Sequence, residues 1–187
     1  MELTGEETIA APLPRVWAAL NDPDVLRRSI EGCESFERTS DTSFEARVTA
    51  RIGPVKLGFG GVVNLTDVDP PRSYTLVGEG SGSGAGFARG QAKVSLNEAG
   101  GSTRLTYQVK AEVGGKLAQI GARLIDQTAR RQAESFFARF AAIVSEGGVQ
   151  PSPARAAGWA YGPSWLWAGA IAAAALAIGF GLGRLWG

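Results

Sequence analysis

Hydrophobic and polar residues alternate along the middle of the chain, which is the pattern of strands with one buried face. The alternation occurs in five runs, over residues 44–52, 55–65, 74–78, 88–96 and 103–113. Turn signals separate these runs: Gly53-Pro54, Asp69-Pro70-Pro71, a glycine-rich stretch over 80–86, and Glu98-Ala99-Gly100-Gly101. Strands joined by short turns pair antiparallel, so we predict a meander of about six strands with one covered face and one wet face.

The chain before this meander predicts one strand and two short helices. Leu3 to Ile9 reads as a strand. Pro14 suits the opening of a helix from about Arg15 to Leu20, because its missing N–H costs little there. A second short helix follows over 24–29, with Asp22 as its N-terminal cap.

The chain after the meander has helical periodicity. From Gly114 to Val144 a stripe recurs at steps of three or four, which predicts one long amphipathic helix of roughly 40 Å. The stripe is Leu117, Ile120, Leu124, Thr128, Gln132, Phe136, Phe140 and Ile143. Arg130 and Arg131 lie off the stripe, so they belong to a solvated face or touch anionic lipid or a partner. A single long helix after strands needs a sheet to cover, so the fold class is α+β, with a curved antiparallel sheet around the helix.

Small residues at inward positions of the sheet leave room beneath that helix. They are Gly61, Gly78, Ala88, Gly90, Ala92 and Ala111. We interpret this room as an apolar pocket, and the alternative is that small residues let the helix sit closer. The large inward residues could rim a cavity or plug it. The predicted lining is Trp17, Leu57, Phe59, Tyr74, Leu76, Phe87, Tyr107, Leu117, Ile120 and Leu124, although Trp17 also fits a plain core position.

The amino-acid composition limits the kinds of partner, catalysis and metal binding that this chain can have. Lysine and arginine nearly balance aspartate and glutamate, 19 against 18, which gives no reason to expect nucleic acid as a partner. The absence of histidine rules out a histidine-dependent mechanism and the commonest zinc ligand. The single cysteine, Cys33, has no second cysteine to pair with, and we interpret it as a structural or free thiol. We therefore predict no catalytic residue and no metal site.

The glycine-rich stretch over 80–86 superficially resembles a phosphate-binding loop. It joins two predicted strands and carries no lysine until Lys93, whereas a phosphate loop opens a helix. We interpret it as a hairpin loop, with a gate at the cavity mouth as a hypothesis. The acidic pairs Glu6 with Glu7 and Asp67 with Asp69 fall in polar, alternating surroundings and are read as solvated surface.

The C-terminal stretch predicts a membrane span. Trp165 to Gly183 contains no charged residue and is about long enough to cross a bilayer. We expect aromatic anchors at Trp165, Trp167, Phe180 and Trp186. The predicted organisation is a ligand-binding domain over 1–146, a linker over 147–163 and a transmembrane anchor over 164–186. The acidic N-terminus shows no export signal, so we expect the domain on the cytoplasmic face of the inner membrane, with a single C-terminal span.

The predicted arrangement resembles the START/Bet v 1-like helix-grip fold, and several motifs resemble one family within it. The segments concerned are 19–37, 52–56 (IGPVK), 69–80 (DPPRSYTLVGEG), 86–96 (GFARGQAKVSL) and 103–126. Together they are similar to the CoxG family of the SRPBCC superfamily, which is named after the G subunit of carbon monoxide dehydrogenase. This resemblance implies a non-catalytic accessory protein that serves a molybdenum-containing hydroxylase of the CO dehydrogenase type. It also implies membrane recruitment and a bound quinone, menaquinone or ubiquinone, with no covalent cofactor.

Two other readings remain open. The chain could be a pure membrane-recruitment module with a solid core and no ligand. It could also be a small enzyme on the same fold, for which Tyr74 and Tyr107 are the inward polar candidates.

Overall fold

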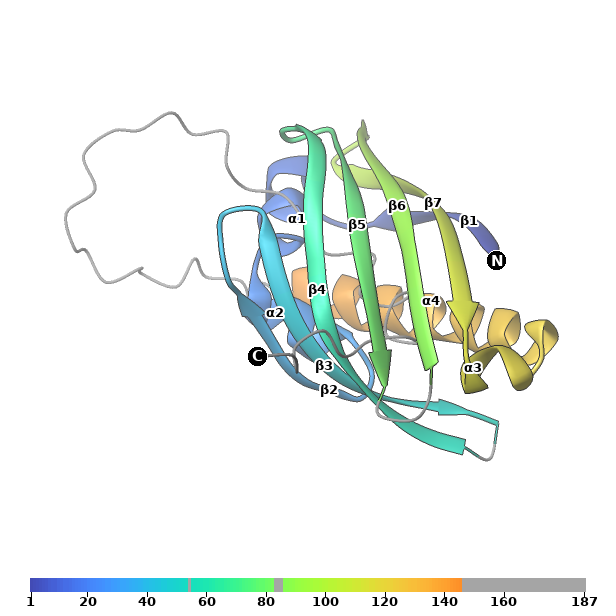
Figure 1. Ribbon diagram of the computed structural model, residues 1–187. Coiled ribbons are helices and arrows are strands. Elements are labelled where there is room, and N and C mark those ends of the chain that lie inside the picture. The colour runs from blue at the N-terminus through green and yellow to red at the C-terminus, as the bar shows by residue number, and fades with distance from the viewer. Residues whose placement is uncertain (54, 83–85, 146–187) are drawn as a thin grey trace.

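The computed structural model describes residues 1–53, 55–82 and 86–145, and the elements within them follow the predicted order (Figure 1). The strands are β1 (Glu2–Ile9), β2 (Cys33–Arg38), β3 (Ser43–Ile52), β4 (Val55–Asp69), β5 (Ser73–Gly82), β6 (Gly86–Ala99) and β7 (Ser102–Gly114). The helices are α1 (Leu13–Ala19), α2 (Pro23–Ser29), α3 (Lys116–Gln119) and α4 (Ala122–Ser145).

The strands form one antiparallel sheet in the order β1-β7-β6-β5-β4-β3-β2. The first strand pairs with the last, with Glu2 opposite Lys110 and Ile9 opposite Thr103. The sheet curves over α4, which crosses behind its inner face (Figure 1). The predicted meander is confirmed, and it includes β2, whose position the alternation did not locate because Phe36 is its one fully buried side chain.

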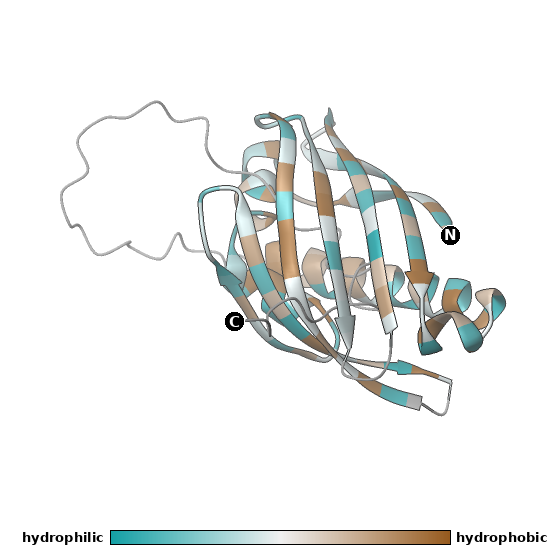
Figure 2. Cartoon of the chain, viewed as in Figure 1, coloured by the Kyte–Doolittle hydropathy of each residue, from teal (hydrophilic) through white to brown (hydrophobic). Residues whose placement is uncertain are grey.

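Alternation along each strand separates a buried face from a solvated one (Figure 2). On β6 the side chains of Ala88, Ala92, Val94 and Leu96 are at most 2% exposed. The residues that alternate with them, Arg89, Gln91, Lys93 and Ser95, are exposed. The predicted period of two is therefore confirmed, and it fixes which side chains can face α4.

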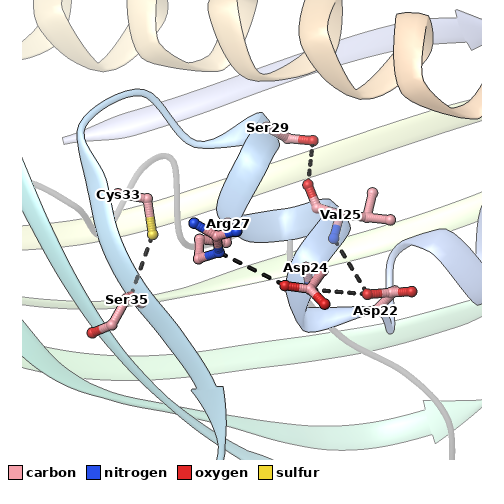
Figure 3. Close-up of polar contacts among 7 residues, drawn as sticks. All are labelled: Asp22, Asp24, Val25, Arg27, Ser29, Cys33 and Ser35. Carbon is pink, nitrogen blue, oxygen red and sulfur yellow. Dashed lines mark hydrogen bonds and ion pairs between the residues drawn. The ribbon is translucent and has the colours of Figure 1, made fainter. Parts of the chain in front are cut away.

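Helix α2 begins at Pro23 and α1 has Pro14 as its second residue, and at both positions a missing N–H costs little. The carboxylate of Asp22 accepts hydrogen bonds from the backbone N–H groups of Asp24 (2.9 Å) and Val25 (3.3 Å), which confirms it as the cap of α2 (Figure 3). The hydroxyl of Ser29 closes the other end by donating to the carbonyl of Val25 at 2.7 Å. Both helices bury apolar faces beside the C-terminal half of α4.

The prediction of one continuous helix from Gly114 to Val144 is wrong. A short α3 is followed by a break at Gly121, whose φ of +100° lies outside the range of a right-handed helix, and α4 begins at Ala122. The break changes the phase of the buried stripe, because residues before and after it no longer lie on one cylinder.

The predicted stripe is also wrong in the first half of α4, because its steps of four residues drift by about 40° each around a helix. Leu124 is 41% exposed, and Thr128 and Gln132 are not buried. The face that α4 buries is Ile125, Ala129, Ala133, Phe136, Phe137, Phe140 and Val144. The true stripe thus passes through two alanines that the periodicity argument did not use.

The predicted linker and span, with Trp165, Trp167, Phe180 and Trp186, lie outside the described residues. Within the part of the chain that the structure describes, no helix is both long and apolar enough to cross a bilayer.

Candidate functional site

Buried apolar side chains between the sheet and the helices form two separate clusters. The larger joins β1 to β7 with α1, α2 and the C-terminal half of α4, and it contains Leu76, Ala92 and Val109. The smaller consists of Ile52, Ala88, Leu117 and Ala129, with Met1, Leu57, Val113 and Ile120 packed against it. Leu57 also packs against the larger cluster. The core is therefore divided in two along the length of α4.

A row of very small residues crosses the sheet at that division. Gly78 on β5 lies opposite Gly90 on β6, and Gly90 lies opposite Ala111 on β7. On one side of this row stand Leu76, Ala92 and Val109 of the larger cluster, which are paired across the same three strands. The side chains of α4 are also small at this division, because Ala129 belongs to the smaller cluster and Ala133 to the larger one.

The backbone of α4 approaches the borders of the sheet more than its middle. Among the described residues, its Cα atoms come within 8 Å of several residues in α2, β1, β3 and α1, and of at most one or two in β5, β6 or β7. If the small residues served to bring the helix closer, the close approaches would fall on the central strands. The observed distribution gives no support to closer approach of α4 as the role of the small residues.

The other end of the interior is filled by aromatic rings. Trp17 and Tyr74 meet edge to face with centroids 5.7 Å apart, and Tyr107 stacks on Phe137 at 5.1 Å. Phe136 contacts Phe137 at 5.1 Å and Phe140 at 5.6 Å. Such pairs stabilise the core beyond their area of burial. Tyr74 and Tyr107, which could have rimmed or plugged a cavity, pack at this filled end.

Gly90 has a second reason to be small. A Cβ at this position would collide with the carbonyl oxygen of Lys110 and approach Cα of Ala111 at 2.9 Å, so β7 passes too close for any side chain. Gly90 therefore cannot be enlarged without moving backbone, whereas Ala111 already carries a Cβ.

The predicted lining residues divide into three groups. Trp17, Phe59, Tyr74, Leu76, Tyr107 and Leu117 are buried, at 8% exposure or less. Leu57 and Ile120 are half-buried beside the smaller cluster. Phe87 and Leu124 form the third group.

The prediction that Phe87 and Leu124 face the interior is wrong, because each is 41% exposed. Phe87 is out of phase with Ala88 on β6, so its ring lies on the outer face and covers Gly114 of β7. Leu124 lies off the buried face because steps of four residues drift by about 40° each around a helix, so three steps before Phe136 the stripe has turned away from the sheet. The predicted lining did not include Ile125, Ala129, Ala133 and Phe137. The signal for them was the spacing of four residues from Ile125 through Ala129 to Ala133, just after Gly121.

Three of the four buried polar side chains in the described core donate hydrogen bonds to backbone carbonyls. The buried polar side chains there are Asn21, Ser29, Thr75 and Thr103. Asn21 Nδ2 donates to the carbonyl of Trp17 at 2.6 Å, and Thr103 Oγ1 donates to the carbonyl of Ala11 at 2.8 Å. Over the same residues, no group of three or more carboxylates or thiols is placed to hold a metal ion.

Two titratable groups are kept protonated by their surroundings. Burial raises the pKa of the Tyr107 hydroxyl, and the carboxylate of Glu7 adds to the rise while Arg130 opposes it. Burial also raises the pKa of the Cys33 thiol to about 11 against the smaller opposing effect of Arg27. Cys33 Sγ donates to the carbonyl of Ser35 at 3.3 Å (Figure 3). Both groups are neutral near pH 7, so neither is poised as a nucleophile or a base.

The outer face of the sheet carries a shallow hollow of about 820 Å³. Its walls include Val62 and Val77, which are 42% and 41% exposed. The charges around it neutralise each other, with Arg89 bound to Glu112 at 2.9 Å and Lys110 to Glu2 at 3.1 Å. This hollow is open and partly polar, and its lining also includes the small-residue row, Gly78, Gly90 and Ala111.

A seven-stranded antiparallel sheet curved over a C-terminal helix, with an apolar interior divided by small residues, is the architecture of Bet v 1-like proteins. The sequence profile of the CoxG family, the G subunit of carbon monoxide dehydrogenase, matches residues 5–145, and the chain belongs to this family. The family is one of accessory subunits, which agrees with a non-catalytic protein and with association with a CO dehydrogenase system.

Several solved structures are similar to this chain. A conserved protein from Geobacillus kaustophilus is 30% identical over 78% of this chain and 96% of its own, with a TM-score of 0.73. TTHA0849 from Thermus thermophilus (18% identical over 80% of this chain and 100% of its own, TM-score 0.62) shows the same fold. So does Ara h 8.0201 (15% over 79% and 99%, TM-score 0.56). Among curated protein sequences no significant match was found.

Proposed function

We propose that this protein holds a hydrophobic small molecule, a quinone, between its sheet and α4, and that it carries this ligand between the bilayer and a molybdenum-containing hydroxylase of the CO dehydrogenase type. The protein acts by binding and proximity and makes or breaks no bond. The domain lies on the cytoplasmic side of the inner membrane, held there by the apolar stretch from Trp165 to Gly183.

The observation that carries this proposal is the row of Gly78, Gly90 and Ala111 between two apolar clusters, beneath a helix that approaches the borders of the sheet. An elongated apolar ligand gains from leaving water in proportion to the apolar area that it buries. The half-buried Leu57 and Ile120 beside the smaller cluster offer such contacts. The aromatic end, already filled, supplies a rigid wall.

Membership of the CoxG family supports the accessory role. The apolar stretch supports the tether, because a carrier fixed to the membrane meets a membrane-soluble ligand at high effective concentration. Together they favour a quinone, an apolar redox molecule resident in bilayers, over a water-soluble ligand.

Native mass spectrometry of the full chain, purified in mild detergent from its own membranes, tests the proposal directly. A stoichiometric isoprenoid quinone that co-purifies with the protein supports a carrier. A ligand-free mass with no uptake of added quinone contradicts it and leaves a recruitment module without a ligand.

A matched pair of variants locates the ligand. Ala111→Leu adds three carbons at the small-residue row, and Ala138→Leu adds the same three carbons on the exposed face of α4. We expect Ala111→Leu to abolish quinone uptake with little loss of stability, because it fills empty space. If the interior were solid, Ala111→Leu would instead overpack it and lower the free energy of unfolding by about 1–3 kcal/mol.

A further inference from the structure

Two of the four large hydrophobic side chains that the described residues expose lie at one end of the molecule. Phe87 is at the start of β6, over Gly114 at the end of β7, and Leu124 is in the first turn of α4. Between them in the fold lies α3 with its flanking glycines, Gly115 and Gly121. We call residues 116–124, from Lys116 to Leu124, the α3 corner. It projects past the border of the sheet at β7 (Figure 1).

The α3 corner makes little contact with the rest of the domain. Ala118, Gln119 and the four residues from Gly121 to Leu124 are exposed, and Leu117 is the one side chain that it fully buries. An exposed leucine beside a half-buried Ile120 is apolar surface that this fold does not use internally.

Cations surround this apolar surface. Lys116 and Arg123 belong to the corner itself, and Arg51 and Lys56 lie on the β3–β4 hairpin at the same end of the sheet. Ile52 of that hairpin packs with Leu117 and Ala129, which places the hairpin beside the corner. Within the described residues none of these four cations forms an ion pair, whereas Arg89 nearby is already bound to Glu112.

The opposite end of the sheet is acidic. Its turns expose Asp41, Asp67, Asp69 and Glu98, with Arg72 as a cation among them. Positive and negative charges are therefore separated along the strands, although the net charge of the whole chain is only +1. An apolar tip ringed by unpaired cations is complementary to a bilayer that carries anionic headgroups.

We propose that the α3 corner and the β3–β4 hairpin rest on a bilayer containing anionic lipids, with Phe87 and Leu124 entering its interface. This inference rests on the proposed membrane tether. It adds an orientation, with the strand ends near Ala111 and Val113 facing the bilayer and the acidic turns facing away. The small-residue row then opens toward the source of an apolar ligand.

The tether is long enough for this orientation. α4 has 24 residues, so Ser145 lies about 36 Å from the α3 corner along the helix. Residues 146–164 can extend to about 60 Å before Trp165 is reached. Both the corner and the predicted span can therefore meet one bilayer.

Depth-dependent quenching tests the orientation on the full chain. A Cys33→Ser background receives a fluorescent label at Ala118→Cys in α3 or, for comparison, at Asn97→Cys at the acidic end of β6. Each protein is reconstituted into phosphatidylcholine vesicles with a minor fraction of phosphatidylglycerol and brominated lipid. We expect strong quenching at residue 118 and none at residue 97.

Three pairs of substitutions keep the test specific. Phe87→Ser with Leu124→Ser should lower quenching at residue 118 at least about twofold, because it removes the apolar contacts with the interface. Val62→Ser with Val77→Ser removes two side chains of equal exposure from the outer face and should change nothing. Lys116→Glu with Arg123→Glu should abolish the dependence on phosphatidylglycerol.

Flotation of the same samples separates the two ideas. If the chain floats with the vesicles but residue 118 is unquenched, or the valine pair matters as much as the Phe87 and Leu124 pair, the docking inference is wrong and the tether stands. If the chain does not float at all, both the tether and the docking inference fail, while quinone binding by the interior is tested separately.

Discussion

Cys33 begins β2, where Arg27 and Glu34 exert opposite effects on its pKa and burial dominates both. The pKa rises from 9.0 to about 11, so the folded protein at about pH 8 holds about a hundredfold less thiolate than the unfolded chain. We expect alkylation by iodoacetamide to be slower in the folded protein by about the same factor. Following the rate with and without urea by mass spectrometry measures it, and equal rates would contradict the assigned environment.

The same shift has a consequence for stability. A thiol whose pKa is higher in the folded state keeps its proton more tightly there than in the unfolded chain. The free energy of unfolding should therefore fall as the pH rises from about 9 toward 11, and Cys33 contributes no pH dependence below that window. In Cys33→Ser this part of the alkaline loss should disappear.

Gly90 and Gly58 lie on neighbouring parts of the sheet but have opposite surroundings. A Cβ on Gly90 would collide with the backbone of β7, whereas a Cβ on Gly58 would meet nothing within 4 Å. We expect Gly90→Ala to lower the free energy of unfolding by about 1–3 kcal/mol. Gly58→Ala should change it by about 0.5 kcal/mol or less. Urea denaturation measures both free energies of unfolding. Equal losses would show that the close approach of β7 to β6 does not exclude a Cβ at residue 90.

At the scale of elements, Gly121 decides where α4 begins. Its φ of +100° strains any residue with a Cβ, although no atom lies within 4 Å of that position. The cost of Gly121→Ala is therefore conformational, and we expect a loss of about 1–2 kcal/mol in the free energy of unfolding. Far-ultraviolet circular dichroism with urea denaturation checks this. A gain in both helicity and stability would mean that α3 and α4 prefer to be one helix.

The strands could be predicted from sequence because their period is set by local geometry. A side chain on a strand points the opposite way from its neighbour whatever the strand packs against, so the alternation from Ala88 to Leu96 indicated the buried face. The placement of Phe87 could have been corrected by the same rule. The start of α4 could not, since helical spacing continues across Gly121 and only the backbone shows the break.

The site itself was only partly predictable. The small residues could be read from the sequence, but whether they make room or permit close contact depends on where α4 lies. That position is set by packing at distant points, such as the contact of Phe137 with Tyr107 and the approach of α4 to α2. Pairing Gly78 with Gly90 and Ala111 also required the register of three strands.

At the scale of the whole molecule, the buried members of the two clusters among the described residues lie between Leu3 and Val144. The similar protein from Geobacillus kaustophilus is itself almost entirely covered by this domain. Removal of Trp159 to Gly187 should therefore leave the unfolding temperature of the domain unchanged and move it from the membrane to the soluble fraction. Sedimentation at high salt with a melting curve tests both points. A truncated protein that still sediments would show that the tail is not the anchor.

The pairing of β1 with β7 brings Glu2 beside Lys110, and it governs when the sheet can be completed. A ribosome releases β1 first, yet this strand has no partner until about a hundred residues have followed it. Contacts between such distant segments make folding slow, because the entropy of closing a long loop is lost before these contacts stabilise the fold. During synthesis the apolar side of β1, with Leu3 and Ile9, stays exposed to solvent until β7 has been made. Among the strands, β1 therefore gives a nascent-chain chaperone the longest time to bind.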